Sequence, residues 1–108
     1  MDVVLTTFAS ADAAAPVVRQ LVEEKLAACG SIVPGVRSIY FWEGQLEDTA
    51  EVIVLFKTTC ADPLMARLSE LHPYDVPEIV RFSAADVAPA YARWVASQCA
   101  ASDGTASR

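Results

Sequence analysis

The stretch SIVPGVRSIYFWEGQLEDTAEVIVLFKTT, residues 31–59, decides the fold because it contains two long β-rich runs joined by a tight turn signal. The first run covers residues 31–42, the second covers residues 46–59, and the tripeptide EGQ lies between them. A short glycine-containing connection between two such runs predicts a β-hairpin. Pro34 and Gly35 interrupt the first run, which indicates a β-bulge or a change of strand partner.

Both arms of this predicted hairpin carry large apolar side chains on each of their two faces. In the first arm Ile39 and Phe41 oppose Tyr40 and Trp42, and in the second arm Ile53 and Leu55 oppose Val52, Val54 and Phe56. A hairpin with one face in water alternates apolar and polar residues instead. We therefore expect two covers for this hairpin, namely helices of its own chain and a neighbouring subunit.

The segment before the hairpin predicts a strand and a helix. A short apolar run at residues 3–8 is typical of a buried strand. Apolar side chains then recur at helical spacing, and these are Val18, Leu21, Val22, Leu26 and Cys29. We expect the helix to begin between residues 12 and 15, so that Pro16 falls in its first turn, and to stop at Gly30. In that helix Cys29 is a core residue.

The segment after the hairpin predicts a helix, a strand and a last helix. The first of these helices spans residues 61–71, with Asp62 as its N-cap and Pro63 as its first residue. The strand follows at residues 78–83. The last helix begins near Val87, and its expected inner face consists of Tyr91, Trp94, Val95 and Cys99.

The predicted order of elements is β-α-β-β-α-β followed by a C-terminal helix. Two βαβ halves of this kind form the ferredoxin-like split βαβ sandwich, an α+β fold with an antiparallel sheet and helices on one face. We expect residues 1–100 to form one such domain and residues 101–108 to form a flexible tail. The bare face of the sheet is then the expected oligomer interface.

Composition excludes several classes of protein. The 108 residues carry a net charge of −6, whereas binding of nucleic acid calls for clustered Lys and Arg. The start MDVVLTTF has no basic targeting region, and the longest uncharged run, residues 26–36, is far shorter than the ~20 residues of a membrane span. Three scattered cysteines without a CxxC pair favour a reducing compartment. We expect a cytoplasmic protein that binds neither nucleic acid nor membranes.

Candidate functional residues concentrate in the loop HPYDVPEI, residues 72–79, whose two prolines prevent an ordinary helix. His72 is the single histidine of the chain. It is interpreted as a cap of the preceding helix, as a contact for a small molecule, or as a metal ligand that recruits Glu78, Asp75 or a neighbour's side chain. The chain has no P-loop, GxGxxG, GxSxG or HExxH signature, and we predict that it is not an enzyme.

Two further residues of the hairpin stand out. Lys57 lies in an otherwise apolar arm, so it should pair with Glu51 or Glu78, or else face an anion. Trp42, at the hairpin tip, is interpreted as an anchor in an oligomer contact or as a surface on which a ligand stacks.

Three stretches together resemble the CutA (divalent-cation tolerance) family: LVEEKLAACGSIVPGVRSIYFWEGQLEDTAEVIVLFKTT, HPYDVPEI and YARW. The resemblance runs from about residue 3 to residue 95, with the motifs in the family's order. It implies a ferredoxin-like fold and a tight homotrimer, similar in architecture to the PII signalling proteins. In such a trimer the sheets pack around a three-fold axis and the hairpins reach across subunits.

The resemblance also implies residue roles. His72 and Glu78 match the family's HPY histidine and PE acid, and they are the expected metal ligands for copper or another divalent cation. Thr6 and Leu71 stand where some bacterial members have a cysteine and a second histidine, which favours harder cations. The remaining lining of the expected inter-subunit cleft, which accepts a metal or small anion, is Tyr40, Trp42, Lys57 and Tyr74. The expected oligomer interface contains Ile39, Phe41, Trp42, Val54, Phe56 and Trp94.

Two functions follow from these expectations. The first is a non-enzymatic homotrimer that confers tolerance to divalent cations. The alternative is a PII-like signalling or scaffold trimer that binds a protein or a small metabolite and has no metal site.

Overall fold

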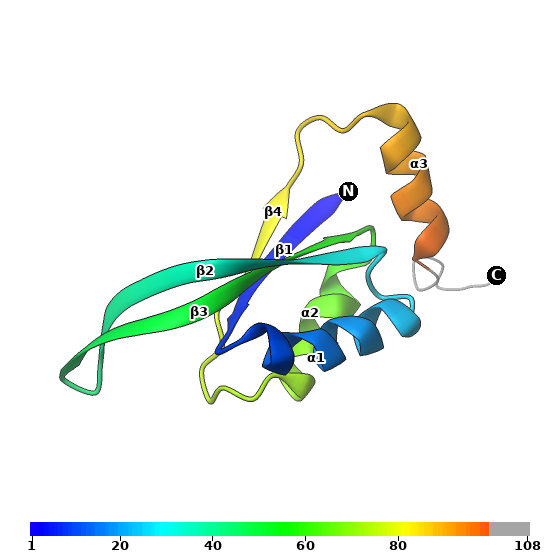
Figure 1. Ribbon diagram of the computed structural model, residues 1–108. Coiled ribbons are helices and arrows are strands. Elements are labelled where there is room, and N and C mark those ends of the chain that lie inside the picture. Colours follow the sequence, from blue (N-terminus) through cyan, green and yellow to red (C-terminus); the bar gives the residue numbers. More distant parts are fainter. Residues whose placement is uncertain (100–108) are drawn as a thin grey trace.

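A four-stranded antiparallel sheet and three helices make up the computed structural model, which describes residues 1–99 (Figure 1). The elements are β1 (Asp2–Phe8), α1 (Ala11–Glu23), β2 (Cys29–Trp42), β3 (Gln45–Thr58), α2 (Ala61–Leu71), β4 (Ile79–Ser83) and α3 (Pro89–Gln98). The strand order is β2-β3-β1-β4, and α1 and α2 lie together on one face of the sheet. The predicted α+β class and antiparallel sheet are confirmed. The predicted tail at residues 101–108 lies outside the described residues.

The core lies between the sheet and the pair α1 and α2. Its largest fully buried side chains are Phe8, Phe56, Leu21, Leu64 and Leu68, which come from β1, β3 and both helices. Burial of one such side chain contributes about 1.5–3 kcal/mol. Helix and sheet approach closely at Gly30, where an added Cβ would lie 2.6 Å from Cγ1 of Val18.

Helix α1 ends six residues before the predicted end, at Glu23. Lys25 adopts a left-handed conformation with φ of 64°, and the amide of Leu26 donates to the carbonyl of Leu21 at 3.1 Å. This pattern is a Schellman motif, in which a lysine occupies the position that glycine usually takes. The prediction that the helix continues to Cys29 is therefore wrong, and Cys29 instead begins β2. Pro16 likewise lies inside the helix and not in its first turn.

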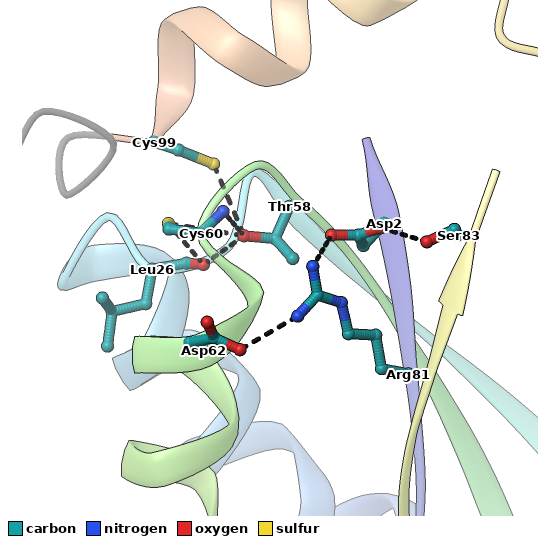
Figure 2. A network of polar contacts seen from close by, with 8 residues as sticks. All are labelled: Asp2, Leu26, Thr58, Cys60, Asp62, Arg81, Ser83 and Cys99. Carbon is teal, nitrogen blue, oxygen red and sulfur yellow. Dashed lines mark hydrogen bonds and ion pairs between the residues drawn. The ribbon is translucent and has the colours of Figure 1, made fainter.

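Helix α2 has the predicted bounds, but its capping differs from the prediction. Cys60 is the N-cap and His72 is the C-cap. Asp62 therefore lies inside the first turn, where its carboxylate accepts a hydrogen bond of 2.9 Å from Arg81 of β4 (Figure 2). The same guanidinium donates to Asp2 of β1 at 2.9 Å, so one arginine joins two strands to the helix.

The hairpin of β2 and β3 has the predicted turn and the predicted bulge. Glu43 and Gly44 have φ values of 50° and 79°, as a two-residue turn with two left-handed positions requires. The register shifts between Val33 and Val36, and Gly35 has a φ of 80°. The bulge divides the hairpin into a proximal half, residues 29–33 and 52–58, and a distal half, residues 36–42 and 45–51.

The distal half projects away from the helices (Figure 1). Its side chains Ile39, Phe41 and Leu46 are 61%, 73% and 62% exposed. Val54 and Phe56 of the proximal half are both 0% exposed, because they pack beneath α1 and α2. The assignment of these two residues to the oligomer interface is therefore wrong, since they form the core of the protomer.

The face of the sheet opposite α1 and α2 is only partly covered. Leu5, Ile53 and Leu55 are half-buried there, and Val80 and Phe82 of β4 are exposed. Apolar surface thus extends from this bare face to the distal half of the hairpin.

Helix α3 lies at the end of the molecule opposite the hairpin tip (Figure 1). Val95 is its buried residue, and Cys99 is its buried C-cap. Tyr91 and Trp94, predicted on the inner face, are exposed. Among the described residues, every helix is too short or too polar to cross a lipid bilayer.

Candidate functional site

A groove of about 880 Å³ lies between the distal half of the hairpin and the loop at residues 74–78. Its lining comes from the end of β1, from both arms of the hairpin and from the loop, and consists of Thr7, Ala9, Ser38, Ile39, Tyr40, Trp42, Thr49, Ala50, Glu51, Tyr74, Asp75, Val76 and Glu78. Four predicted site residues, Tyr40, Trp42, Tyr74 and Glu78, meet here. His72 and Lys57 are not part of the lining.

The groove is acidic and aromatic. Glu51, Asp75 and Glu78 contribute three carboxylates, and the described lining contains no Lys, Arg or His. Tyr40 and Trp42 expose part of their rings beside these carboxylates. A concave surface of one charge sign attracts ligands of the opposite sign, and aromatic faces add to the attraction for cations. The lining therefore favours a cation, whereas the sequence analysis left a small anion open.

Lys57 lies on the bare face of the sheet, where it contacts a neighbouring strand. Its ammonium donates to the hydroxyl of Ser31 at 2.7 Å and to the carbonyl of Leu55 at 3.2 Å. The predicted partners Glu51 and Glu78 are not among these acceptors. Lys57 therefore provides no counter-charge in the groove of its own protomer.

His72 is buried next to the groove and holds the loop against β1. Tyr74 donates its backbone amide to Nδ1 of His72 at 3.1 Å, so the ring proton resides on Nε2. Nε2 in turn donates to the carbonyl of Thr7 at 2.7 Å. The ring also stacks on Phe8, with centroids 4.3 Å apart. Both nitrogens are thus engaged inside the protomer, and neither points a lone pair at the groove.

The protonation of His72 follows from this environment. Burial lowers the pKa of the imidazole below its usual value, although the Thr7 carbonyl and the charge of Glu51 oppose the shift. The ring is accordingly neutral at physiological pH. The imidazole does not cap the preceding helix, as one interpretation expected: its acceptor is a carbonyl of β1, and the C-cap bond to Leu68 is made by the backbone amide of His72.

Tyr74 connects the loop to the hairpin. Its hydroxyl donates to the carboxylate of Glu51 at 2.8 Å. Burial, together with this bond to Glu51, raises the pKa of Tyr74 to about 12, so the phenol stays protonated. Thr49 of the same strand also lines the groove, and its buried hydroxyl has no hydrogen-bond partner within residues 1–99.

The sequence analysis missed Glu51 as a groove residue. It considered this acid only as a partner for Lys57, six positions along β3. Because side chains alternate along a strand, both residues share a face, but the twist and the bulge carry Glu51 toward the loop. The only local signal was an acid directly before the apolar run at residues 52–56, and the bond from Tyr74 depends on tertiary structure.

A complete metal site is not present in one protomer. Across the described part of the chain, no three His, Cys, Asp or Glu side chains converge on one point. Thr6, which stands where some relatives were expected to have a cysteine, is buried on the core side of β1. The carboxylate oxygens of the groove belong to Glu51, Asp75 and Glu78, and a divalent cation held there would need further donors from water or from another copy of the chain.

Comparisons with known proteins agree on one family. The family model described as CutA1 divalent ion tolerance protein matches residues 2–98. The divalent-cation tolerance protein CutA of Thermus thermophilus is 46% identical over 96 residues, which cover 87% of this chain and 93% of that protein.

Solved structures show the same fold. The crystal structure of CutA from Xylella fastidiosa superposes with a TM-score of 0.86 at 33% identity, covering 91% of this chain and 96% of that one. The PII-like protein CutA from a Nostoc species, in its apo form, gives a TM-score of 0.83 at 32% identity, with coverage of 92% and 97%.

Proposed function

The chain belongs to the CutA1 divalent ion tolerance family, and from this membership we propose that it is a non-enzymatic homotrimer that binds divalent cations. The observation that carries the proposal is the acidic, aromatic groove beside the distal half of the hairpin. The cation is a ligand of this groove and not a resident cofactor.

The donor set determines which cations fit. Glu51 and Glu78 offer carboxylate oxygens, and Ser38 and Thr49 offer hydroxyls. Oxygen donors suit hard divalent ions, and Cu(II) is accommodated where imidazole or carboxylate ligands are available. We therefore propose copper(II) and harder divalent ions as the ligands to compare. His72 contributes by fixing the loop that carries Glu78.

A homotrimer accounts for the exposed apolar surface. The distal half and the bare face expose large side chains, among them Ile39, Phe41, Leu46, Val80 and Phe82. A soluble monomer rarely leaves so much contiguous apolar surface in water. A cyclic assembly covers it by repeating one heterologous contact until the ring closes. In the trimer the neighbour's side chains would border the groove and could complete a cation site.

Calorimetric titration of the assembled protein tests cation binding. We expect Glu51→Gln and Glu78→Gln each to weaken binding of Cu(II) by at least tenfold, and the double variant to abolish it. Glu47→Gln is the matched control, because Glu47 lies on the same strand outside the lining. Equal affinity in the double variant and the control would remove the groove as the site.

The role of His72 is separable in the same titration. His72→Gln keeps a hydrogen-bonding side chain and should retain Cu(II) binding wherever circular dichroism shows an intact fold. A complete loss of binding in a folded His72→Gln trimer would instead restore the histidine as a direct ligand.

One observation favours the PII-like alternative as a second candidate. A volume of about 880 Å³ exceeds the need of one metal ion and matches that of a small organic ligand. A metabolite would then bind with a cationic group over Tyr40 and Trp42. A thermal-shift screen of divalent cations and organic cations separates the two functions, because the native ligand raises Tm by mass action.

A further inference from the structure

Two cysteines from distant parts of the sequence meet at one hydroxyl group (Figure 2). Sγ of Cys60 lies 3.4 Å from Oγ1 of Thr58, and Sγ of Cys99 lies 3.8 Å from the same oxygen. Both cysteines are buried, and they share a small apolar cluster with Ala28 and Val95. Because both sulfur atoms contact the same atom, they are close neighbours.

The pair lies at the junction between α3 and the rest of the protomer. Cys60 is the N-cap of α2, and Cys99 is the C-cap of α3. Val95 is the buried residue of α3 itself, whereas Tyr91 and Trp94 point outward. Because α3 buries little of its own surface, a bond between the two sulfurs would attach this helix more firmly to the rest of the protomer.

The hydrogen bonds at this junction tolerate the loss of both thiol protons. The hydroxyl of Thr58 donates to the carbonyl of Leu26 at 2.7 Å, and the amide of Cys60 donates to Oγ1 of Thr58 at 2.8 Å. These two bonds are short and involve no sulfur. Sγ of Cys60 also contacts the carbonyl of Leu26 at 3.3 Å, and a thiol is a weak donor. Oxidation of the sulfurs thus leaves the two bonds of Thr58 in place.

We propose that Cys60 and Cys99 form a reversible disulfide when the protein meets a hydroperoxide. Cys60 attacks the terminal peroxide oxygen in its thiolate form. The O–O bond breaks, Cys60 becomes a sulfenic acid, and the leaving oxygen departs as water or alcohol after protonation. The thiolate of Cys99 then attacks that sulfur, the S–O bond breaks, and a second molecule of water leaves. The two thiols together lose two electrons, and the peroxide gains them.

The bond would close a loop that contains α2, β4 and α3. A disulfide across a long loop stabilises a protein chiefly by restricting its unfolded state. The oxidised protein should therefore have a higher Tm than the reduced protein. Neither cysteine lines the groove. The disulfide and the proposed cation binding can therefore be tested independently.

Peptide mapping of the full chain tests the proposal. After treatment with hydrogen peroxide, denaturation and alkylation, we expect one alkylated cysteine, Cys29, and a linked pair of peptides that contain Cys60 and Cys99. Dithiothreitol should return all three alkylation sites. Cys29→Ser is the matched control and should form the same link with a raised Tm.

The order of the two steps has its own readout. In Cys99→Ser the sulfenic acid on Cys60 should persist and react with dimedone, whereas Cys60→Ser should give no dimedone adduct at Cys99. Three alkylated cysteines after oxidation of the unsubstituted chain would overturn the proposal. A disulfide that involves Cys29 would also overturn it. Both results come from the unsubstituted chain, so neither depends on whether a variant folds.

Discussion

The two halves of the long hairpin both contain large apolar side chains, but these lie in opposite environments. Phe56 of the proximal half is 0% exposed, whereas Phe41 of the distal half is 73% exposed. The proximal half packs on α1 and α2, and the distal half extends past both helices (Figure 1). An apolar pattern in a strand therefore does not show whether the strand is covered by its own chain.

The two halves consequently serve different purposes. The proximal half stabilises the protomer through its own core. The distal half contributes little to that core; it exposes large apolar side chains, which we propose as the assembly surface, and it forms one wall of the groove. The bulge at Gly35 separates the two regions by bending the hairpin away from the helices.

Truncation of one phenylalanine in each half should give the largest contrast. Phe56→Ala is expected to lower the free energy of unfolding by about 3–5 kcal/mol, because it leaves a cavity under α1 and α2. Phe41→Ala should change the unfolding of the protomer far less. Urea denaturation under conditions that hold the oligomeric state fixed measures both values, and equal losses would show that the two halves are not distinct.

A charge placed in the distal half should break assembly and spare the fold. Phe41→Asp is expected to raise the dissociation constant of the oligomer at least about 30-fold, which corresponds to the ~2 kcal/mol of an interface hot spot. Thr59→Asp, at an exposed position outside the hairpin, is the control. Analytical ultracentrifugation gives the constants, and circular dichroism reports the fold. An unchanged constant would place the interface elsewhere.

Two glycines sharpen the contrast through different physical causes. Gly30→Ala in the proximal half brings a Cβ within 2.6 Å of Val18, and overpacking of this kind costs about 1–3 kcal/mol. Gly35→Ala meets no atom within 4 Å, but its φ of 80° costs a non-glycine residue about 1–2 kcal/mol. Thermal denaturation should therefore show the larger loss for Gly30→Ala. A neutral Gly30→Ala would mean that helix and sheet approach less closely.

The smallest expected effect is a pH dependence at His72, which anchors against β1 the loop that faces the distal half. Its pKa is lowered in the folded protein, so the unfolded chain takes up a proton at a higher pH than the native chain does. Stability from this group is therefore complete above the unfolded pKa of about 6.5 and decreases as the pH falls toward the folded pKa. Denaturation midpoints measured between about pH 7.5 and pH 5.5 should fall, and His72→Gln should flatten that dependence. A slope that persists unchanged in the variant would assign it to carboxylates.

Local signals explain what was predictable from the sequence. The turn at Glu43-Gly44, the bulge at Gly35 and the bounds of α2 all depend on residues that are close in sequence. The predicted end of α1 was wrong because the prediction relied on the nearest glycine, Gly30. The left-handed position that ends the helix is instead occupied by Lys25. Residue preferences predict that a glycine ends a helix, but in α1 the Schellman hydrogen bonds form around a lysine.

The site was only partly predictable because its partners come from distant strands. Tyr40, Trp42, Tyr74 and Glu78 line one groove of the protomer, whereas the family resemblance implied a cleft between subunits. The bond from Nε2 of His72 depends on Thr7 of β1, and the bond to Glu51 depends on Tyr74. The contact of Lys57 with Ser31 likewise depends on strand register. Such pairings follow from tertiary structure and have no counterpart in sequence spacing.

Sedimentation velocity of the unmodified chain at micromolar concentration tests the account most directly. Because residues 1–99 of one protomer leave the distal half exposed and the bare face only partly covered, we predict a single species with three times the mass of the chain. A stable species with the mass of one chain would show that the exposed arm needs no neighbour, and the assignment of the two hairpin halves to core and assembly would fail.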